Sequence, residues 1–146
     1  MLPRWHIVLG FLFSIILFLI IPGVSWIMIS LVFLASVFID LDHYANAVYK
    51  TGNISLFSAF DYYKQKEREE IAERKRGIRR RGDFQFFHTI EFHLLIALLG
   101  FVWIGFFYIF MGMAFHSLLD IIDMGRSGML YRREFVFSNW IYEKIR

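Results

Sequence analysis

The stretch WHIVLGFLFSIILFLIIPGVSWIMISLVFLASVFI (residues 5–39) decides the fold, because it contains two long apolar runs with only a short break between them. The runs cover residues 5–21 and 24–39, and Pro22 and Gly23 separate them. Each run approaches the length that an α-helix needs to cross the hydrocarbon core of a bilayer. We therefore expect a hairpin of two membrane-spanning helices.

A third apolar block covers residues 84–122 and is nearly twice as long as one membrane-spanning helix. We divide it near residues 100–105 into two short helices. The composition agrees, since 58% of the chain is hydrophobic and these residues gather in runs instead of at amphipathic spacing. The chain thus predicts an all-α integral membrane bundle, a single transmembrane domain over residues 1–146 with spans at about 5–22, 24–41, 85–103 and 105–123.

The positions of lysine and arginine predict the orientation of these spans. Ten of the sixteen lie in the segment 42–84 between the second and third spans, and five more follow Asp123. The short connections at the opposite ends of the spans carry none. By the positive-inside rule, we expect a multi-pass protein with the segment 42–84 and both chain ends in the cytoplasm.

Within that segment, residues 56–81 are expected to form an amphipathic helix on the cytoplasmic surface. The helix would begin with an apolar stripe of Leu56, Phe57, Phe60 and Tyr63. The following run KQKEREEIAERKRGIRRR interleaves acids and bases, as in a solvated helix stabilised by pairs four residues apart. Because the acids offset most of the positive charge, nucleic acid is not an expected partner, whereas membrane lipid is.

Acidic and histidine residues gather at the three span ends that this topology places together in the cytoplasm. They are Asp40, Asp42 and His43 after the second span, His88 and Glu91 at the start of the third, and His116, Asp120 and Asp123 at the end of the fourth. Their spacings of three, four and seven residues place the last two sets each on one helix face. Ionisable groups beside membrane spans are costly and therefore indicate a functional site.

We predict a metal site, with Asp40, Asp42, His43, His88, His116 and Asp120 as ligands. The chain has no cysteine, so a transition metal must be bound by histidine and carboxylate, which suits Zn²⁺ first and also Mn²⁺ or Fe²⁺, with Mg²⁺ as a further alternative and room for one or two ions. The alternative is a structural lock, in which the carboxylates pair with histidine or with arginine from the segment 42–84. His6 at the lipid boundary, and His93 about 140° around its helix from His88, are expected to be structural.

The chain resembles the family of membrane-bound metal-dependent hydrolases, small four-helix proteins also described as LexA-regulated. The resemblance rests on FIDLDHY (residues 38–44), FHTIEFHLL (residues 87–95) and FHSLLDIID (residues 115–123), whose order and spacing follow the family pattern over most of the chain. The chain departs from the family before the third span, where Phe87, His88 and Thr89 stand in place of a His-Arg-Gly ahead of Thr-His. The resemblance implies hydrolysis and leaves the substrate open.

We therefore expect a metal-dependent hydrolase that acts at the cytoplasmic leaflet on a lipid or amphiphilic ester or phosphoester, such as a phospholipid. Glu91 or Asp123 would take the proton of the attacking water as general base. The unbalanced cluster Arg79, Arg80 and Arg81 would bind an anionic headgroup or, alternatively, contact anionic lipid. The rival function is a non-enzymatic metal-binding or ion-handling membrane protein, although the first two spans offer only serines as a polar path.

Overall fold

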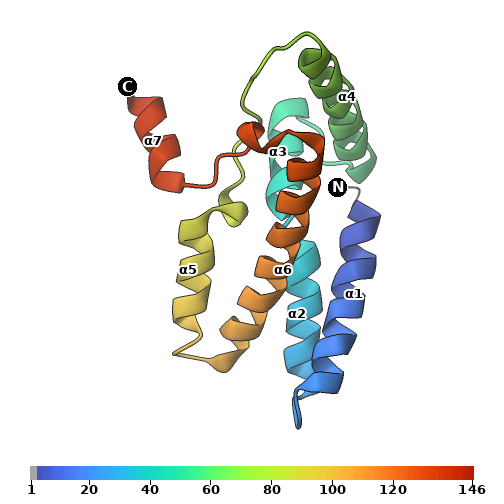
Figure 1. Cartoon of the computed structure of the whole chain (residues 1–146), viewed down its shortest axis with the longest axis vertical. Helices are drawn as coiled ribbons and strands as arrows, with labels where there is room; N and C mark the ends of the chain where they lie inside the picture. Colours follow the sequence, from blue (N-terminus) through green and yellow to red (C-terminus); the bar gives the residue numbers. More distant parts are fainter. Residues whose placement is uncertain (1–2) are drawn as a thin grey trace.

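The computed structural model describes residues 3–146, and these residues fold into helices joined by short connections (Figure 1). The elements are α1 (Pro3–Ile20), α2 (Trp26–Phe38), α3 (Leu41–Thr51), α4 (Leu56–Lys75), η1 (Phe86–His88), α5 (Ile90–Leu99), α6 (Ile104–Ser127), η2 (Leu130–Arg132) and α7 (Phe137–Ile145). The predicted all-α class is confirmed for this part of the chain.

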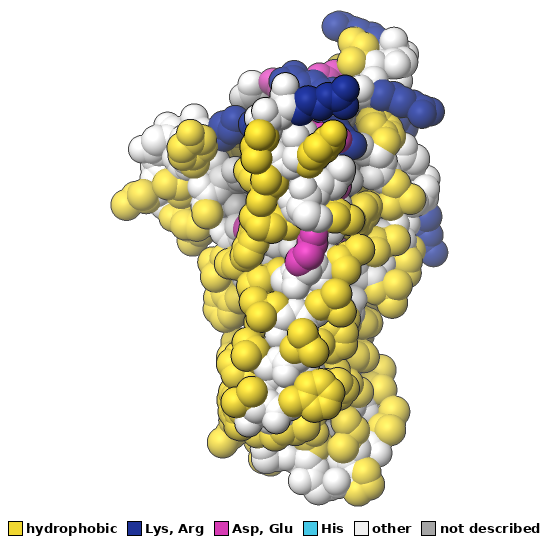
Figure 2. All heavy atoms as spheres, turned by 90° about the vertical axis from the view of Figure 1, so that its left-hand side faces the viewer, with side chains coloured by type: hydrophobic (Ala, Val, Ile, Leu, Met, Phe, Trp, Pro, Cys, Tyr) yellow, Lys and Arg dark blue, Asp and Glu magenta, His cyan; other side chains and the backbone are white. Residues whose placement is uncertain are grey.

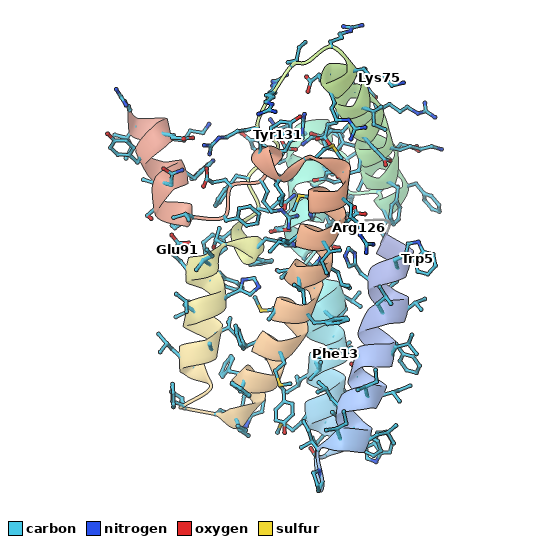
Figure 3. The ribbon with its side chains drawn as sticks, viewed as in Figure 1. Trp5, Phe13, Lys75, Glu91, Arg126 and Tyr131 are labelled. Carbon is cyan, nitrogen blue, oxygen red and sulfur yellow. The ribbon has the colours of Figure 1, made fainter. Side chains whose placement is uncertain are left out.

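Helix α6 packs along α2, and α1 and α5 lie beside this central pair (Figure 1). The two central helices touch through backbone at Gly112, because a Cβ atom there would lie 2.2 Å from the carbonyl oxygen of Val32. Val32 itself is fully buried. Helix α1 joins α6 through the ring of Phe13, which stacks on Phe115 at a centroid distance of 4.1 Å (Figure 3).

On the face shown in Figure 2, apolar side chains cover the lower part of the molecule, while lysine and arginine lie mainly toward the upper end. Leu19 is 77% exposed, Trp26 71% and Phe101 90%, and so much exposed apolar area marks a surface that meets lipid or protein. Two helical stretches are long and apolar enough to cross a membrane, namely Trp26–Thr51, which combines α2 with α3, and Ile104–Ser127, which is α6. The apolar helices α1 and α5 are shorter, and α5 extends only about 15 Å.

The helix predicted at 24–41 is interrupted at Ile39 and Asp40, near the end where the sequence predicts that its last turn unwinds. Helix α2 ends at Phe38, and after Ile39 and Asp40 the chain continues as α3. Asp40 has dihedral angles of φ −74° and ψ 3°, so it stands at the junction of the two helices instead of in a regular turn. Asp40 therefore lies just after the last turn of α2, at the end of the apolar helix.

The third predicted span begins later than expected. The hydroxyl of Thr89 accepts a hydrogen bond from the amide of Phe92 at 3.4 Å, which caps α5 and starts it at Ile90. His88 therefore belongs to the preceding 3₁₀ turn η1, and the prediction that His88 and Glu91 share one helix face is wrong. The structure has a helix, α4, where one was predicted at 56–81, although α4 already ends at Lys75, before Gly77 with its positive φ of 74°.

The motif-bearing ends of the apolar helices meet at one end of the molecule, which also carries α3, α4 and α7 (Figure 1). The start of α1 and the end of α7 lie at this same end. The connections at residues 21–25 and 100–103 lie at the opposite end. This arrangement brings residues that are far apart in the chain close together.

Replacing Gly112 with alanine is expected to lower the free energy of unfolding by roughly 1–3 kcal/mol, because the added Cβ would push α2 and α6 apart. The matched control is Gly125→Ala in the same helix, where the Cβ would meet only Leu130 Cδ1 at 3.9 Å. That change should stabilise by about 0.5–1 kcal/mol through helix propensity. Unfolding in sodium dodecyl sulfate, followed by circular dichroism, measures both, and equal stability of the two variants would contradict the close contact.

Candidate metal centre

The carboxylate of Asp40 faces three imidazole nitrogens that come from separate parts of the chain. Its Oδ1 atom lies 3.5 Å from Nε2 of His43, 3.5 Å from Nε2 of His88 and 3.3 Å from Nε2 of His116. These distances exceed the usual 2.7–3.2 Å of a hydrogen bond. They match the roughly 3.4 Å between two ligands that share a tetrahedral ion with bonds near 2.1 Å.

Each of these imidazoles is held by a partner at its other nitrogen, Nδ1. The partners are the carbonyl oxygen of Ser36 for His116 (2.7 Å), Oδ2 of Asp42 for His88 (3.1 Å) and the side-chain amide of Gln85 for His43 (3.1 Å). At His88 and His116 the partner is an oxygen, so Nδ1 donates and the lone pair of Nε2 is directed toward the centre, as is usual in metal-binding histidines. At His43 the contacting atom is Nε2 of Gln85, which can only donate. Flipping this amide would let its Oε1, which is buried without a partner, accept from Nδ1–H and would give His43 the same orientation.

Asp120 forms the second acidic position of the centre, one turn after His116 on α6. Its Oδ2 lies 3.6 Å from His116 Nε2 and 3.9 Å from His88 Nε2. Its Oδ1 lies 3.2 Å from Nε2 of His6, whose ring stacks on His116 at 4.0 Å. The predicted alignment of His116 with Asp120 on one helix face is thus confirmed.

His6 is the histidine that sequence reasoning missed. We expected it at the lipid boundary, but its ring is 96% buried inside the centre, so that expectation is wrong. The signal was present in the predicted topology, which places the start of the first span at the same end as the other motifs. His93 remains structural, as predicted, since it contacts the carbonyl oxygen of Thr89 at 2.9 Å and Ser117 Oγ at 3.1 Å.

Three overlapping trios in the described residues bring their ligand atoms within 4.8 Å of one another, close enough to hold a metal ion. They are His6, Asp40 and His116; Asp40, His43 and His88; and His88, His116 and Asp120. Nε2 of His88, Nε2 of His116 and Nδ1 of His6 are buried without a hydrogen-bond partner in this part of the chain, whereas Nε2 of His6 has the carboxylate of Asp120 at 3.2 Å. Unpaired buried nitrogens are costly, so their gathering around two carboxylates fits a divalent cation.

Asp42 occupies a supporting position instead of the ligand position that we predicted. Its Oδ2 accepts a hydrogen bond from the amide of Phe87 at 3.1 Å and contacts Nδ1 of His88 at the same distance. The side chain of Asp42 thus reaches η1, and none of the three trios includes it. The carboxylate therefore orients His88.

Glu91, a predicted general base, instead holds the start of α7 (Figure 3). Its carboxylate accepts hydrogen bonds from the amides of Phe137 at 2.9 Å and Ser138 at 3.0 Å, and from the Ser138 hydroxyl at 3.2 Å. This is a helix N-terminus bound by an anion, the arrangement that the helix dipole favours. Because α5 begins only at Ile90, the side chain of Glu91 faces α7 and not the metal centre.

A cavity of about 1060 Å³ lies beside the centre and reaches the start of α1 and the helices α3 and α4. The candidate ligands His6, Asp40, His43 and Asp120 line it, and so does Asp123, the other predicted base, one turn further along α6. Its apolar wall consists of Trp5, Ile7, Phe38, Leu41, Leu56 and Phe60. The cavity thus combines polar and apolar walls, which suits an amphiphilic ligand.

The predicted headgroup ligands Arg79, Arg80 and Arg81 do not line this cavity. They pair elsewhere: Arg79 stacks over the Tyr131 ring at 5.5 Å, Arg80 lies 3.8 Å from Glu73, and Arg81 pairs with Glu134 and Glu143. The arginines in the cavity wall are Arg132 and Arg133, because the chain reverses at Gly128 and returns to the centre after α6. The sequence showed these two residues, but only as part of the positive tail.

Helix α4 is tied to the centre through Tyr63 and Lys66. The Tyr63 hydroxyl donates a hydrogen bond to the carbonyl oxygen of His43 at 2.8 Å. Burial, together with the negative charge of Asp83, raises the pKa of Tyr63, so the hydroxyl stays a donor. Burial disfavours the charged form of Asp83, but the ion pair with Lys66 outweighs it and lowers the pKa of Asp83. These contacts hold the cavity wall in place.

Comparisons of the chain with protein-family models, with curated proteins and with solved structures find no match. The resemblance to membrane-bound metal-dependent hydrolases therefore stays a prediction from three motifs. The chemistry of the centre is inferred from its own residues and distances.

Replacing Asp42 with asparagine is expected to weaken metal binding by about 10–100-fold, because the carboxylate that orients His88 loses its charge. His116→Ala should remove stoichiometric metal altogether, since it deletes a shared ligand. Elemental analysis and titration against a competing chelator measure both effects. The control is His93→Gln, a histidine outside the trios, which should bind metal like the parent. Parental affinity in Asp42→Asn would contradict the supporting role.

The change Glu91→Gln should loosen α7 without altering metal content, because Glu91 binds the amides of Phe137 and Ser138 and none of the metal trios includes it. Hydrogen exchange of residues 137–145 should become faster, and elemental analysis should match the parent. Unchanged exchange combined with lost metal would show that Glu91 belongs to the centre after all.

Proposed function

We propose that the chain is a multi-pass membrane protein that binds a divalent ion at the cytoplasmic end of four spans and hydrolyses a lipid or amphiphilic ester or phosphoester there. The apolar exterior of α1, α2, α5 and α6 supports the bundle, with residues 86–103 crossing together because α5 alone is short. The gathering of lysine and arginine at the end with both termini supports the cytoplasmic orientation (Figure 2).

One observation carries the proposal. Three imidazole nitrogens converge on a single oxygen of Asp40 at 3.3–3.5 Å, while the other nitrogen of each ring is held by a partner. A purely structural lock would form hydrogen bonds of normal length at both ends of the rings. His43, His88, His116, Asp40 and Asp120 are the proposed ligands, with His6 beside them.

A divalent ion in such a centre supplies Lewis acidity, which polarises an ester or phosphoryl oxygen and acidifies water. The protein residues contribute orientation and proton transfer. Asp123 lines the cavity one turn beyond Asp120, and we assign it the role of proton acceptor in place of Glu91. The apolar wall with Trp5, Leu41 and Phe60 would exclude water from one side of the reacting group and hold the apolar part of the substrate.

Ion transport is the rival function, and the serines of the first two spans count against it. Ser14 Oγ donates a hydrogen bond to Gly10 O at 2.8 Å, and Ser36 Oγ donates to Phe33 O at 2.8 Å. Each of these two hydroxyls thus donates its proton to a carbonyl of its own helix.

Hydrolysis is tested with purified protein in neutral detergent on a panel of phospholipids, lipid phosphates and neutral lipid esters. We expect stoichiometric zinc, manganese or iron in the parent, hydrolysis of at least one class, and loss of hydrolysis in His116→Ala. Asp123→Asn should lower kcat by about 100-fold or more while metal content stays at the parental level, as expected for a general base. His93→Gln is the control with parental activity.

Two results would overturn the proposal. A parent that is folded but free of metal after expression with added zinc and manganese would remove its basis. Full activity of His116→Ala would show that hydrolysis, if present, does not need this centre.

A further inference from the structure

Arg133 is a buried cation in the cavity wall beside the metal centre. Its side chain is only 9% exposed, and its Nη1 atom lies 2.9 Å from Oδ2 of Asp120. Among the residues that the structure describes, Arg133 forms an ion pair with Asp120. Asp120 also faces the imidazoles of His6, His88 and His116, so its charge is shared and does not belong to Arg133 alone.

The neighbouring arginine shows a guanidinium whose two Nη atoms both pair with carboxylates, although its Nε has no partner in the described residues. Arg132 binds Glu70 at 3.2 Å through Nη2 and Glu73 at 3.1 Å through Nη1. A guanidinium carries five N–H donors in a planar fork that fits two oxygens of one phosphate. Arg133 contacts Asp120 through Nη1 alone. Its other N–H groups can therefore bind an anion that enters the cavity.

An apolar wall accompanies this cation in the same cavity. Leu41, Leu56 and Phe60 line it, and they are 49%, 61% and 58% exposed. Trp5 and Ile7 from the start of α1 continue this wall. A ligand that fills the cavity therefore places a negative group at Arg133 and an apolar chain along α1 and α4.

We infer that the cavity binds a phosphate-bearing amphiphile, with its phosphate on the Arg133 guanidinium and its chain against Leu41, Leu56 and Phe60. The inference rests on the proposed function and specifies its substrate class, a phosphoester instead of a neutral ester. It assigns recognition of the phosphate to Arg133 and takes that role away from Arg79, Arg80 and Arg81.

The test measures binding of phosphonates, which resist hydrolysis, to the metal-loaded protein in maltoside micelles by isothermal titration calorimetry. The probes are hexylphosphonate, methylphosphonate and the neutral hexyl glucoside. Hexylphosphonate should bind at least about tenfold more tightly than methylphosphonate, because burial of the longer chain adds to the affinity. Hexyl glucoside should bind weakly.

The variants separate Arg133 from the other arginines. Arg133→Gln and Arg133→Lys should each weaken hexylphosphonate binding by about tenfold or more, since the lysine keeps the charge but loses the fork. Arg81→Gln, on a guanidinium paired with Glu134 and Glu143, should bind within about twofold of the parent. If Arg133→Gln fails to fold, as judged by gel filtration, Arg133→Lys decides the test.

Parental binding in a folded Arg133→Lys or Arg133→Gln variant would overturn the inference, as would weaker binding in Arg81→Gln alone or equal affinity for hexylphosphonate and methylphosphonate. The result is separable from the proposed function. If hexylphosphonate binding depends on Arg133 but the protein has no hydrolytic activity, the phosphate site is supported and the proposed hydrolase function is contradicted. If the protein hydrolyses neutral esters equally well with and without Arg133, the hydrolase function is supported and the phosphate site is contradicted.

Discussion

The carboxylate of Asp40 is the group on which the rest of the structure depends. A carboxylate that is largely withdrawn from water needs partners around it, and the side chain of Asp40, which is 29% exposed, finds them on α3, η1 and α6. The break between α2 and α3 gives this carboxylate its direction, and the backbone contact at Gly112 brings α6 close enough for His116 to reach it. The geometry of the centre thus depends on how α2 and α6 pack against each other.

Much of this could be read from the sequence, because apolar run length and charge distribution together fix which helix ends lie side by side. That argument placed Asp40, His43, His88, His116 and Asp120 in one region, where the structure has them. It failed wherever position depends on a local start or a chain reversal. Thr89 caps α5 and starts it at Ile90, so His88 lies outside the helix and Glu91 faces α7. The chain reversal at Gly128 brings Arg133 to Asp120, whereas the charge distribution of the sequence showed Arg133 only as part of a positive carboxyl-terminal segment.

The segments outside the apolar helices complete the centre. The amide of Gly82 donates a hydrogen bond to Arg132 O at 2.8 Å, and the amide of Ile90 donates to Phe135 O at 2.9 Å, so the residues after α6 are fastened along the connection that leads into α5. Glu91 continues this attachment into α7. The same connection supplies Gln85 and His88. The connection between α4 and α5 therefore both orients the imidazoles of His43 and His88 and holds the segment that carries Arg133.

The residues of the centre are spread over almost the whole chain, from His6 in the first helix to Asp120 near the end of the last long one. During synthesis the amino-terminal residues emerge first, and several seconds pass before the later ones follow. A nascent chain therefore holds His6 and Asp40 well before it has His116 and Asp120. The candidate metal centre is assembled only when translation has passed α6, so a polypeptide truncated before α6 lacks His116 and Asp120 and cannot complete it.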